Sequence, residues 1–235
     1  EKMIDSGRKR QWRSIFGVGP EVIAHVWNLM IQNLSHVMKE TLGDKPPNPE
    51  HFLWAIIFLK VYGNEATNCR IAGGVDENTF QKWAWLYVRK ISCLFSEVVI
   101  FENRYIEDEG NDCLISVDGA DFEIQEPSPF NEGWYSHKFS GPGLSMPDRG
   151  YHDEDPSKVK TPSRLGDSRA QRKMRGKVHA GHETVNKRFR HFGVLNQRFR
   201  HDILDHGDVF RAVVVLTQTS IEKGEPLFSV DYKDK

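Results

Sequence analysis

The sequence predicts an α/β protein whose first half is all helical and whose second half contains strands. Three observations lead to this class. Apolar residues recur every three or four positions in 20–38 and again in 77–92, which is typical of helices that bury one face. The apolar run 113–117 has the length of a strand. An acidic stretch with a glycine, 106–112, lies between the two halves and predicts domains at 1–110 and 111–235.

The first half is predicted to contain several helices. Pro20 opens an amphipathic helix whose apolar positions continue to Met38. A proline-rich break follows, and the segment 51–62 is apolar nearly all round, so it is expected to be a buried helix. A further amphipathic pattern covers 77–92, and Asp76 is the residue expected to cap its N-terminus.

A short helical segment, 66–72, a Gly73-Gly74 turn and the helix 77–92 have the order of a helix-turn-helix. The second of these helices has a polar face, in which Lys82 and Arg89 are the cations expected to contact DNA. The full face consists of Asn78, Gln81, Lys82, Trp85 and Arg89. A plain helical hairpin packed on its neighbours is the alternative, and the pattern alone favours that alternative.

The second half mixes strands and helices. Phe122 and Ile124 predict a strand that returns after 113–117, and 135–139 predicts another. The segment 141–147 is rich in glycine and proline and is not expected to form a buried strand. A basic helix with one apolar side is predicted over 168–192, and an apolar segment covers 209–222.

Charge is distributed unevenly along the chain. The net charge is −1, yet residues 157–200 contain thirteen Lys or Arg and two acids, Asp167 and Glu183. Such a block is typical of a solvated face, a disordered arm or a phosphate-binding surface, and composition does not separate these. The longest apolar run, 52–62, is shorter than the roughly twenty residues of a membrane span, so no membrane partner is expected.

The cysteines indicate the compartment. Cys69, Cys93 and Cys113 are three in number and lie far apart in apolar stretches. This arrangement predicts neither a disulfide framework nor a CxxC metal site, and it fits a reducing, intracellular environment.

Three acidic residues stand out by their neighbours. Asp118 directly follows the predicted strand 113–117, Asp148 precedes Arg-Gly-Tyr, and Glu183 lies inside the basic helix. Each has a plain explanation by itself: a hairpin turn at Asp118, a loop at Asp148, and an ion pair from Glu183 to Lys187. Taken singly, these explanations are favoured.

Taken jointly, the three segments match a family pattern. They are Val117-Asp118-Gly119-Ala120, where the family usually has Asp-Gly-Thr, Asp148-Arg149-Gly150-Tyr151, which matches Asp-x-Gly-Tyr, and His182-Glu183-Thr184-Val185-Asn186-Lys187-Arg188-Phe189. In these segments the chain resembles the DDE transposases of the PIF/Harbinger type and their bacterial insertion-sequence relatives. Residues 134–138, 141–143 and 199–202 also look like those around the family's core, and the helix-turn-helix-like region looks like the one that precedes it.

The resemblance implies a metal-dependent endonuclease that cuts and joins DNA phosphodiesters. Asp118, Asp148 and Glu183 would be its catalytic residues and also its ligands for Mg²⁺ or Mn²⁺, because hard cations prefer oxygen ligands and relieve the repulsion between carboxylates. In an RNase H-like sheet, Asp118 would lie on the first strand, Asp148 at the end of the fourth strand, and Glu183 on a facing helix. The implied DNA-phosphate contacts are Lys187, Arg188, Arg190, Arg198 and Arg200.

The interval between the first two acids is shorter than this fold requires. Twenty-nine residues separate Asp118 from Asp148, whereas the missing strands and crossover helix need roughly 40. Prolines and glycines in the interval leave no stretch that could form the crossover helix. We therefore expect 111–235 to be a truncated RNase H-like domain, incomplete between 144 and 147, without catalytic activity.

Three functions stay open at the level of sequence: an active DDE endonuclease, a non-catalytic DNA-binding protein, and a decayed transposon remnant that folds only in its helical first half. DNA is the expected partner in the first two, and a homo-oligomer is also open. The expected location is the nucleus in a eukaryote and the cytoplasm otherwise.

Overall fold

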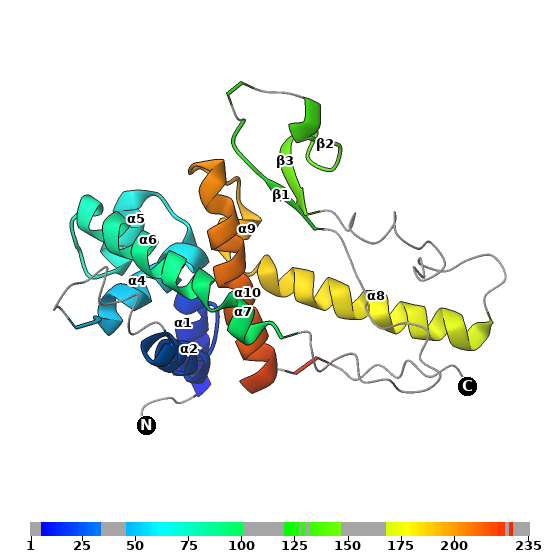
Figure 1. Ribbon diagram of the computed structural model, residues 1–235, viewed down its shortest axis with the longest axis horizontal. Coiled ribbons are helices and arrows are strands. Elements are labelled where there is room, and N and C mark those ends of the chain that lie inside the picture. The colour runs from blue at the N-terminus through cyan, green and yellow to red at the C-terminus, as the bar shows by residue number, and fades with distance from the viewer. Residues whose placement is uncertain are drawn as a thin grey trace.

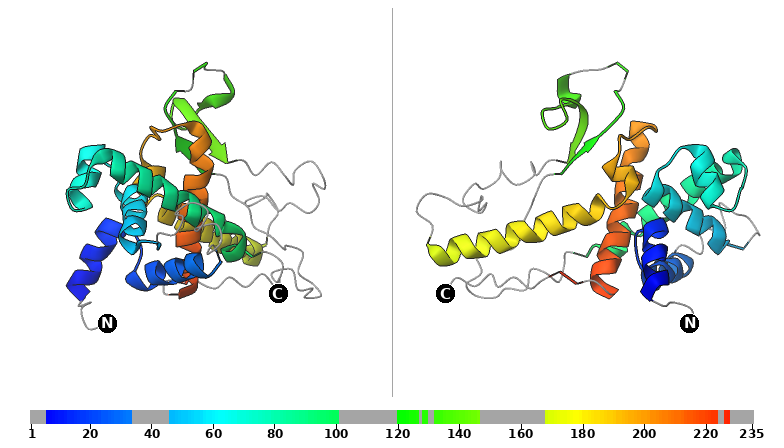
Figure 2. Two further views of the ribbon diagram at one scale, coloured as in Figure 1. Left: turned by 60° about the vertical axis from the view of Figure 1, so that its left-hand side comes forward. Right: turned by 180° about the vertical axis from the view of Figure 1, so that it is seen from behind.

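The computed structural model describes residues 6–33, 46–100, 120–126, 128–129, 132–146, 168–223 and 226–227. These residues form a body of helices, a small sheet beside one end of it, and a long helix that extends away from the body (Figures 1 and 2). The predicted α/β class is correct in the coarse sense that helices dominate and the strands join in one antiparallel sheet. The predicted strand 113–117 lies outside the described residues.

The first half contains the predicted helices. They are α2 Pro20–Asn33, α4 Pro49–Val61, α5 Glu65–Ile71 and α6 Glu77–Cys93. Two further helices, α1 Ser6–Phe16 and α7 Phe95–Val98, were not predicted from the sequence. Local signals explain their bounds: Pro20 and Pro49 occupy first helical positions, where the missing N–H costs nothing, and Tyr62 ends α4 in the left-handed region. Helix α4 is buried along most of its length, as predicted. The expected extension of α2 to Met38 lies outside the described part of the chain.

The hairpin of α5 and α6 is held by caps at both helix starts. Asn64 Oδ1 accepts a hydrogen bond from the Thr67 N–H at 2.8 Å, and Asp76 Oδ2 accepts one from the Thr79 N–H at 3.0 Å. Gly73 and Gly74 adopt φ of 100° and 81°, which only glycine adopts readily. The predicted capping role of Asp76 and the glycine turn are therefore confirmed.

The second half forms a three-stranded sheet in the order β1-β3-β2, with β1 Ala120–Glu123, β2 Tyr135–Ser136 and β3 Gly141–Met146. The segment 141–147 was not expected to be a buried strand. Residues 141–146 form the central strand β3, although among residues 141–144 only Gly143 is buried. Proline has no N–H to donate, but the strand uses the carbonyl of Pro142, which accepts a hydrogen bond from the Ile124 N–H at 3.3 Å. The predicted strand 135–139 is confirmed only at its first two residues, because residues 137–140 form a turn.

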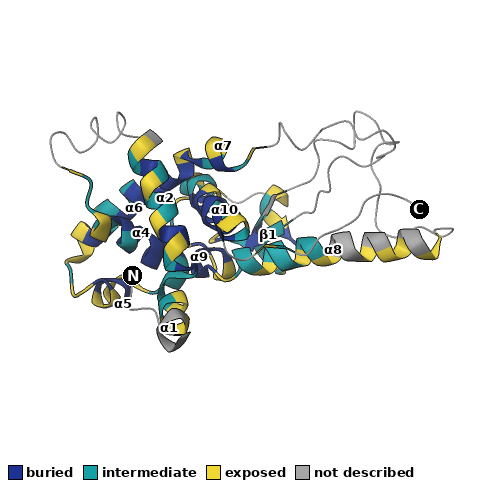
Figure 3. Cartoon of the chain, turned by 90° about the horizontal axis from the view of Figure 1, so that it is seen from below, coloured by how far each residue is buried: buried dark blue, intermediate teal, exposed yellow. Residues whose placement is uncertain are grey.

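Four helical elements follow in the described part of the chain after residue 167: α8 Arg169–Phe189, α9 Gly193–Asn196, the 3₁₀ turn η3 Ile203–Asp205, and α10 His206–Lys223. Helix α8 confirms the predicted basic helix, and α10 covers the apolar segment 209–222. Helix α10 packs against α2 and α6, while α9 packs against α4. Figure 3 shows that the inner faces of α4, α6 and α10 are buried.

The core is continuous across the predicted domain boundary. Val26 and Ile56 from the first half belong to the same buried cluster as Phe122, Val213 and Leu216 from the second half. Described residues from both sides of the predicted boundary therefore share one hydrophobic core. No described helix is by itself long and apolar enough to cross a membrane, although the bent pair Arg10–Phe16 and Pro20–Gln32 meets the length and hydropathy criteria jointly.

Candidate nucleic-acid interface

Helix α8 carries the main concentration of positive charge. Its 21 residues contain seven Lys or Arg and a single acid, Glu183. Arg169, Arg172, Lys173 and Lys187 are exposed. The helix meets the body at its C-terminal end, where the Phe189 ring lies 5.6 Å from the Phe210 ring of α10, and its other end extends away from the body (Figure 1). Exposed cations thus follow one another along a helix that is about 30 Å long at the usual rise per residue.

Glu183, the third predicted catalytic acid, lies in the C-terminal half of α8. It is exposed and lines a hollow of about 440 Å³ together with Thr184, Asn186, Lys187, Arg190 and His191. In the described structure no ion pair joins Glu183 to Lys187, so the plain explanation of Glu183 as half of that pair does not hold.

The described residues include only one of the three predicted metal ligands. Asp118 and Asp148 lie outside the described residues, so Glu183 is the one member of the triad that the structure places. Within the described ranges, no group of three His, Cys, Asp or Glu residues lies close enough to hold a metal ion. Glu183 therefore has no described partner for binding a divalent cation, and we derive no metal-dependent step from it.

Three predicted phosphate-binding arginines make contacts within the protein. Arg190 Nη2 donates to the Asp121 carbonyl at 3.3 Å, which joins the residue directly after α8 to β1. Arg198 forms an ion pair with Glu123, with Nη2 2.6 Å from Oε1. Arg200 donates from Nη2 to the carbonyl oxygens that end α4. Some of the N–H donors that the family resemblance implied would bind DNA phosphates are therefore used within the protein.

The other two predicted contacts on α8 differ in exposure. Lys187 is exposed, and the described residues offer it no ion pair, so its ammonium is accessible to a phosphate. Arg188 is half-buried, and its Nη1 is buried without a hydrogen-bond partner in the described structure. Lys187 thus fits the predicted role better than Arg188 does.

The predicted polar face of α6 lines a groove against η3. Asn78, Gln81, Lys82, Trp85 and Arg89 surround it, and the groove has a volume of about 450 Å³. Its remaining wall is Asp205. The pattern on α6 therefore identified the groove-lining residues of this helix.

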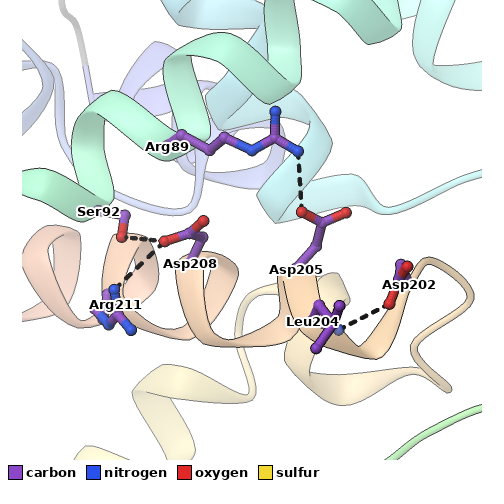
Figure 4. A network of polar contacts seen from close by, with 7 residues as sticks. All are labelled: Arg89, Ser92, Asp202, Leu204, Asp205, Asp208 and Arg211. Atoms are coloured by element: carbon purple, nitrogen blue, oxygen red, sulfur yellow. Dashed lines mark hydrogen bonds and ion pairs between the residues drawn. The ribbon is translucent and has the colours of Figure 1, made fainter. Parts of the chain in front are cut away.

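Figure 4 shows how η3 and the start of α10 are held against α6. Arg89 Nη2 donates to Asp205 Oδ1 at 3.0 Å. One turn further along both helices, the Ser92 hydroxyl donates to Asp208 Oδ1 at 2.8 Å, and Arg211 Nη1 lies 3.5 Å from the same oxygen. Asp202 caps η3 by accepting from the Leu204 N–H at 3.0 Å. One of the two predicted cations of α6 is thus already paired with a carboxylate.

Asp205 was not predicted from the sequence. The spacing of Asp202 and Asp205 is a usable signal for a helical start, because a capping residue is often followed by an acid three positions later. Its partner is not readable in this way, since Arg89 and Asp205 are 116 positions apart.

Acidic residues gather at the N-terminal end of α6. Asp76 caps the helix, Glu77 is in its first turn, and Glu65 of α5 accepts a hydrogen bond from the Gln81 amide. The pKa of the Cys69 thiol is raised. Burial is the largest cause, and the negative charges of these three carboxylates add to it. A recognition helix normally contacts DNA bases with its N-terminal end. In α6 this end is surrounded by negatively charged side chains.

Trp85, which lines the groove, packs in an aromatic cluster. The Trp85 ring lies 5.0 Å from Phe58 and 5.1 Å from His201. Burial, followed by the Arg200 charge, lowers the pKa of His201. The His201 imidazole is therefore harder to protonate than a free histidine side chain.

Comparisons of this chain with protein-family models, with curated proteins and with solved structures gave no match.

Proposed function

We propose that this chain is a transposase-derived DNA-binding protein that does not cleave DNA. The observation that carries the proposal is the exposed, basic helix α8. Arg172, Lys173 and Lys187 are exposed along it, and Glu183 is its single acid. DNA carries a phosphate charge roughly every 1.7 Å, so a helix with exposed cations that extends from the body can contact several phosphates at once.

Helix α8 is favoured over α6 as the main DNA contact. The exposed charges of the α5–α6 hairpin nearly cancel, because Glu65, Asp76 and Glu77 offset its cations. A duplex lying against the N-terminal end of α6 would bring phosphates close to these carboxylates. The helix-turn-helix-like hairpin is therefore a secondary contact in this proposal.

The absence of cleavage is supported by the elements between the first two acids. Among the described residues from 120 to 146 there are short antiparallel strands and a 3₁₀ turn but no α-helix. An RNase H-like core needs a crossover helix in this interval, so the truncation inferred from the sequence agrees with these elements. A metal-dependent DDE endonuclease using Mg²⁺ or Mn²⁺ is the competing function. The third possibility, folding of the first half alone, is disfavoured because α10 residues such as Val213 and Leu216 belong to the same buried cluster as the first-half helices.

Salt-dependent binding tests the proposal. Affinity for a labelled duplex is measured by fluorescence anisotropy over a series of salt concentrations. The triple variant Arg172→Gln, Lys173→Gln, Lys187→Gln is expected to lower the slope of log affinity against log salt by about 2 to 3, since each phosphate contact contributes roughly 0.9.

A matched control removes three exposed cations elsewhere: Arg70→Gln, Lys138→Gln and Lys223→Gln. This variant has the same net charge as the α8 triple variant and is expected to retain most of the slope. Equal losses in the two variants would mean that overall charge, and not α8, determines binding. A wild-type chain that binds no duplex at low salt would exclude the proposed function.

A further inference from the structure

The groove between α6 and η3 brings together side chains of three kinds. Trp85 offers an indole ring, Asn78 and Gln81 offer amides, and Lys82 and Arg89 offer cations. An aromatic ring stacks on any nucleobase, an amide hydrogen-bonds to a base edge, and a cation binds a phosphate. The groove is shallow and open to solvent, with a volume of about 450 Å³. Together these groups match the chemistry of one nucleotide.

We propose that this groove binds one unpaired nucleotide of a DNA strand, with the base against Trp85 and the neighbouring phosphates on Lys82 and Arg89. The inference rests on the proposed DNA-binding function and names the form of DNA that α6 recognises. Stacking on Trp85 needs a base whose face is accessible, and in a duplex both faces of each internal base are covered by its neighbours.

The ring that receives the base is fixed before any ligand arrives. Phe58 and His201 contact Trp85 at centroid distances of 5.0 and 5.1 Å, and both partners belong to other elements of the body. Gln81 donates to Glu65, which fixes the amide at the edge of the groove. A pre-formed site loses less conformational entropy on binding than one that must be assembled.

Arg89 is positioned for a phosphate by Asp205. Its guanidinium carbon lies over the Trp85 ring, 5.8 Å from the ring centroid, and its Nη2 lies 3.0 Å from Asp205 Oδ1. The Arg89 side chain is 55% exposed, so the ion pair is screened by water and costs little to exchange for a phosphate. Asp205 thus holds the arginine next to the indole ring.

The acids around the groove favour a single strand. Glu65, Asp76 and Glu77 lie at the N-terminal end of α6, where the backbones of a duplex along the helix would pass. One nucleotide needs only the stretch from Asn78 to Arg89, in which both cations lie. Repulsion by the acids therefore penalises the duplex more than the unpaired strand.

The experiment uses the full chain with two probes, a fluorescein-labelled oligothymidine strand and a duplex of the same length. Trp85→Leu is expected to weaken binding of the single strand about 5- to 160-fold, the range of one base–aromatic stack, and to leave duplex affinity nearly unchanged. Lys82→Gln and Arg89→Gln are each expected to lower the single-strand salt slope by about 0.7. Arg70→Gln, an exposed cation of the same hairpin outside the groove, is the control and is expected to leave that slope unchanged.

Because Trp85 packs on Phe58 and His201, the unfolding curve of Trp85→Leu is recorded, and Trp85→Phe, which keeps an aromatic ring, is expected to retain most of the affinity. If Trp85→Leu does not fold, the exposed residue Lys82 decides the question. Unchanged single-strand binding in Lys82→Gln and Arg89→Gln, or equal loss for both probes in Trp85→Leu, overturns the inference and leaves DNA binding through α8 intact. A wild-type chain that binds neither probe overturns the proposed function itself.

Discussion

Arg200 and Tyr62 are joined by three contacts. Arg200 Nη2 donates to the Tyr62 carbonyl at 2.7 Å, the guanidinium lies 4.6 Å from the Tyr62 ring, and the Arg200 N–H donates to the Tyr62 hydroxyl at 2.7 Å. The same Nη2 also lies 2.9 Å from the Gly63 carbonyl. Arg200 therefore satisfies carbonyls at the C-terminal end of α4 from a distant part of the chain.

Replacement of Arg200 is thus expected to reduce stability more than DNA affinity. Arg200→Ala removes charge-assisted hydrogen bonds to two carbonyls, and we expect it to lower the free energy of unfolding by about 1.5 to 3 kcal/mol. Urea denaturation measures the change. Lys223→Ala, an exposed cation at the end of α10, is the control and is expected to change stability by less than about 0.5 kcal/mol. Unchanged stability with a large loss of duplex affinity would instead assign Arg200 to DNA.

Local sequence signals predicted much of the helical body. The Pro49 start of α4, the Asp76 cap of α6 and the glycines at 73 and 74 act over a few residues, so they can be read from the sequence. The groove-lining face of α6 was predicted for the same reason, because positions 78, 81, 82, 85 and 89 share one side of a helix.

Long-range partners were not predictable. The Arg200 carbonyl contacts span 138 and 137 positions, and the Arg89–Asp205 pair spans 116. Strand β3 was missed because glycine and proline normally weaken a strand, whereas here Gly143 is needed to allow the close approach of Ser136. The number of Lys and Arg residues identified α8 as basic. It did not distinguish Lys187, whose ammonium is accessible, from the arginines at 190, 198 and 200, which bind groups within the protein.

Gly143 gives a direct test of the sheet. A Cβ atom at this position would lie 2.6 Å from the Ser136 Cβ, which is too close for any real contact. We expect Gly143→Ala to destabilise the packing of β2 on β3 by about 1 to 3 kcal/mol, because one of the strands must shift. Hydrogen exchange of the amides in 135–146 measures the effect.

Gly176→Ala is the matched control for this substitution. Gly176 lies in α8, and among the described residues no atom comes within 4 Å of the added Cβ. Alanine is the better helix former, so this variant is expected to gain up to about 1 kcal/mol. If both variants changed the exchange of 135–146 equally, the close approach of Gly143 and Ser136 would not be the cause.

His206 makes the stability of the fold depend on pH. It is fully buried, its ring lies 5.0 Å from Phe199 and 5.6 Å from Phe122, and neither ring nitrogen has a hydrogen-bond partner among the described groups. Burial lowers the pKa of His206 from 6.5 to about 4. The unfolded chain therefore binds a proton at a higher pH than the folded chain does, and stability falls as the pH decreases from 6.5 towards 4.

A pKa difference of this size corresponds to a loss of roughly 3 kcal/mol, complete once the pH is below the folded value. Urea unfolding at successive pH values measures it. His206→Phe, which fits the aromatic surroundings, is expected to remove most of this dependence, although His201 also has a pKa lowered by burial and contributes in the same direction. A His206→Phe chain with the wild-type pH profile would assign the acid sensitivity to other groups.

Glu183 separates the binding function from the endonuclease function. As the single acid on α8, it repels the phosphates that the neighbouring cations attract, so Glu183→Gln is expected to raise duplex affinity about two- to fivefold at low salt, from the loss of one unfavourable surface interaction. Anisotropy measures the affinity, and Asp118→Ala is expected to leave it unchanged. In the same samples, nicking of supercoiled DNA in Mn²⁺ is expected for neither the wild type nor the variants. Nicking by the wild type that disappears in both Glu183→Gln and Asp118→Ala would establish the metal-dependent endonuclease instead, because a carboxylate that only repels DNA cannot be required for cleavage.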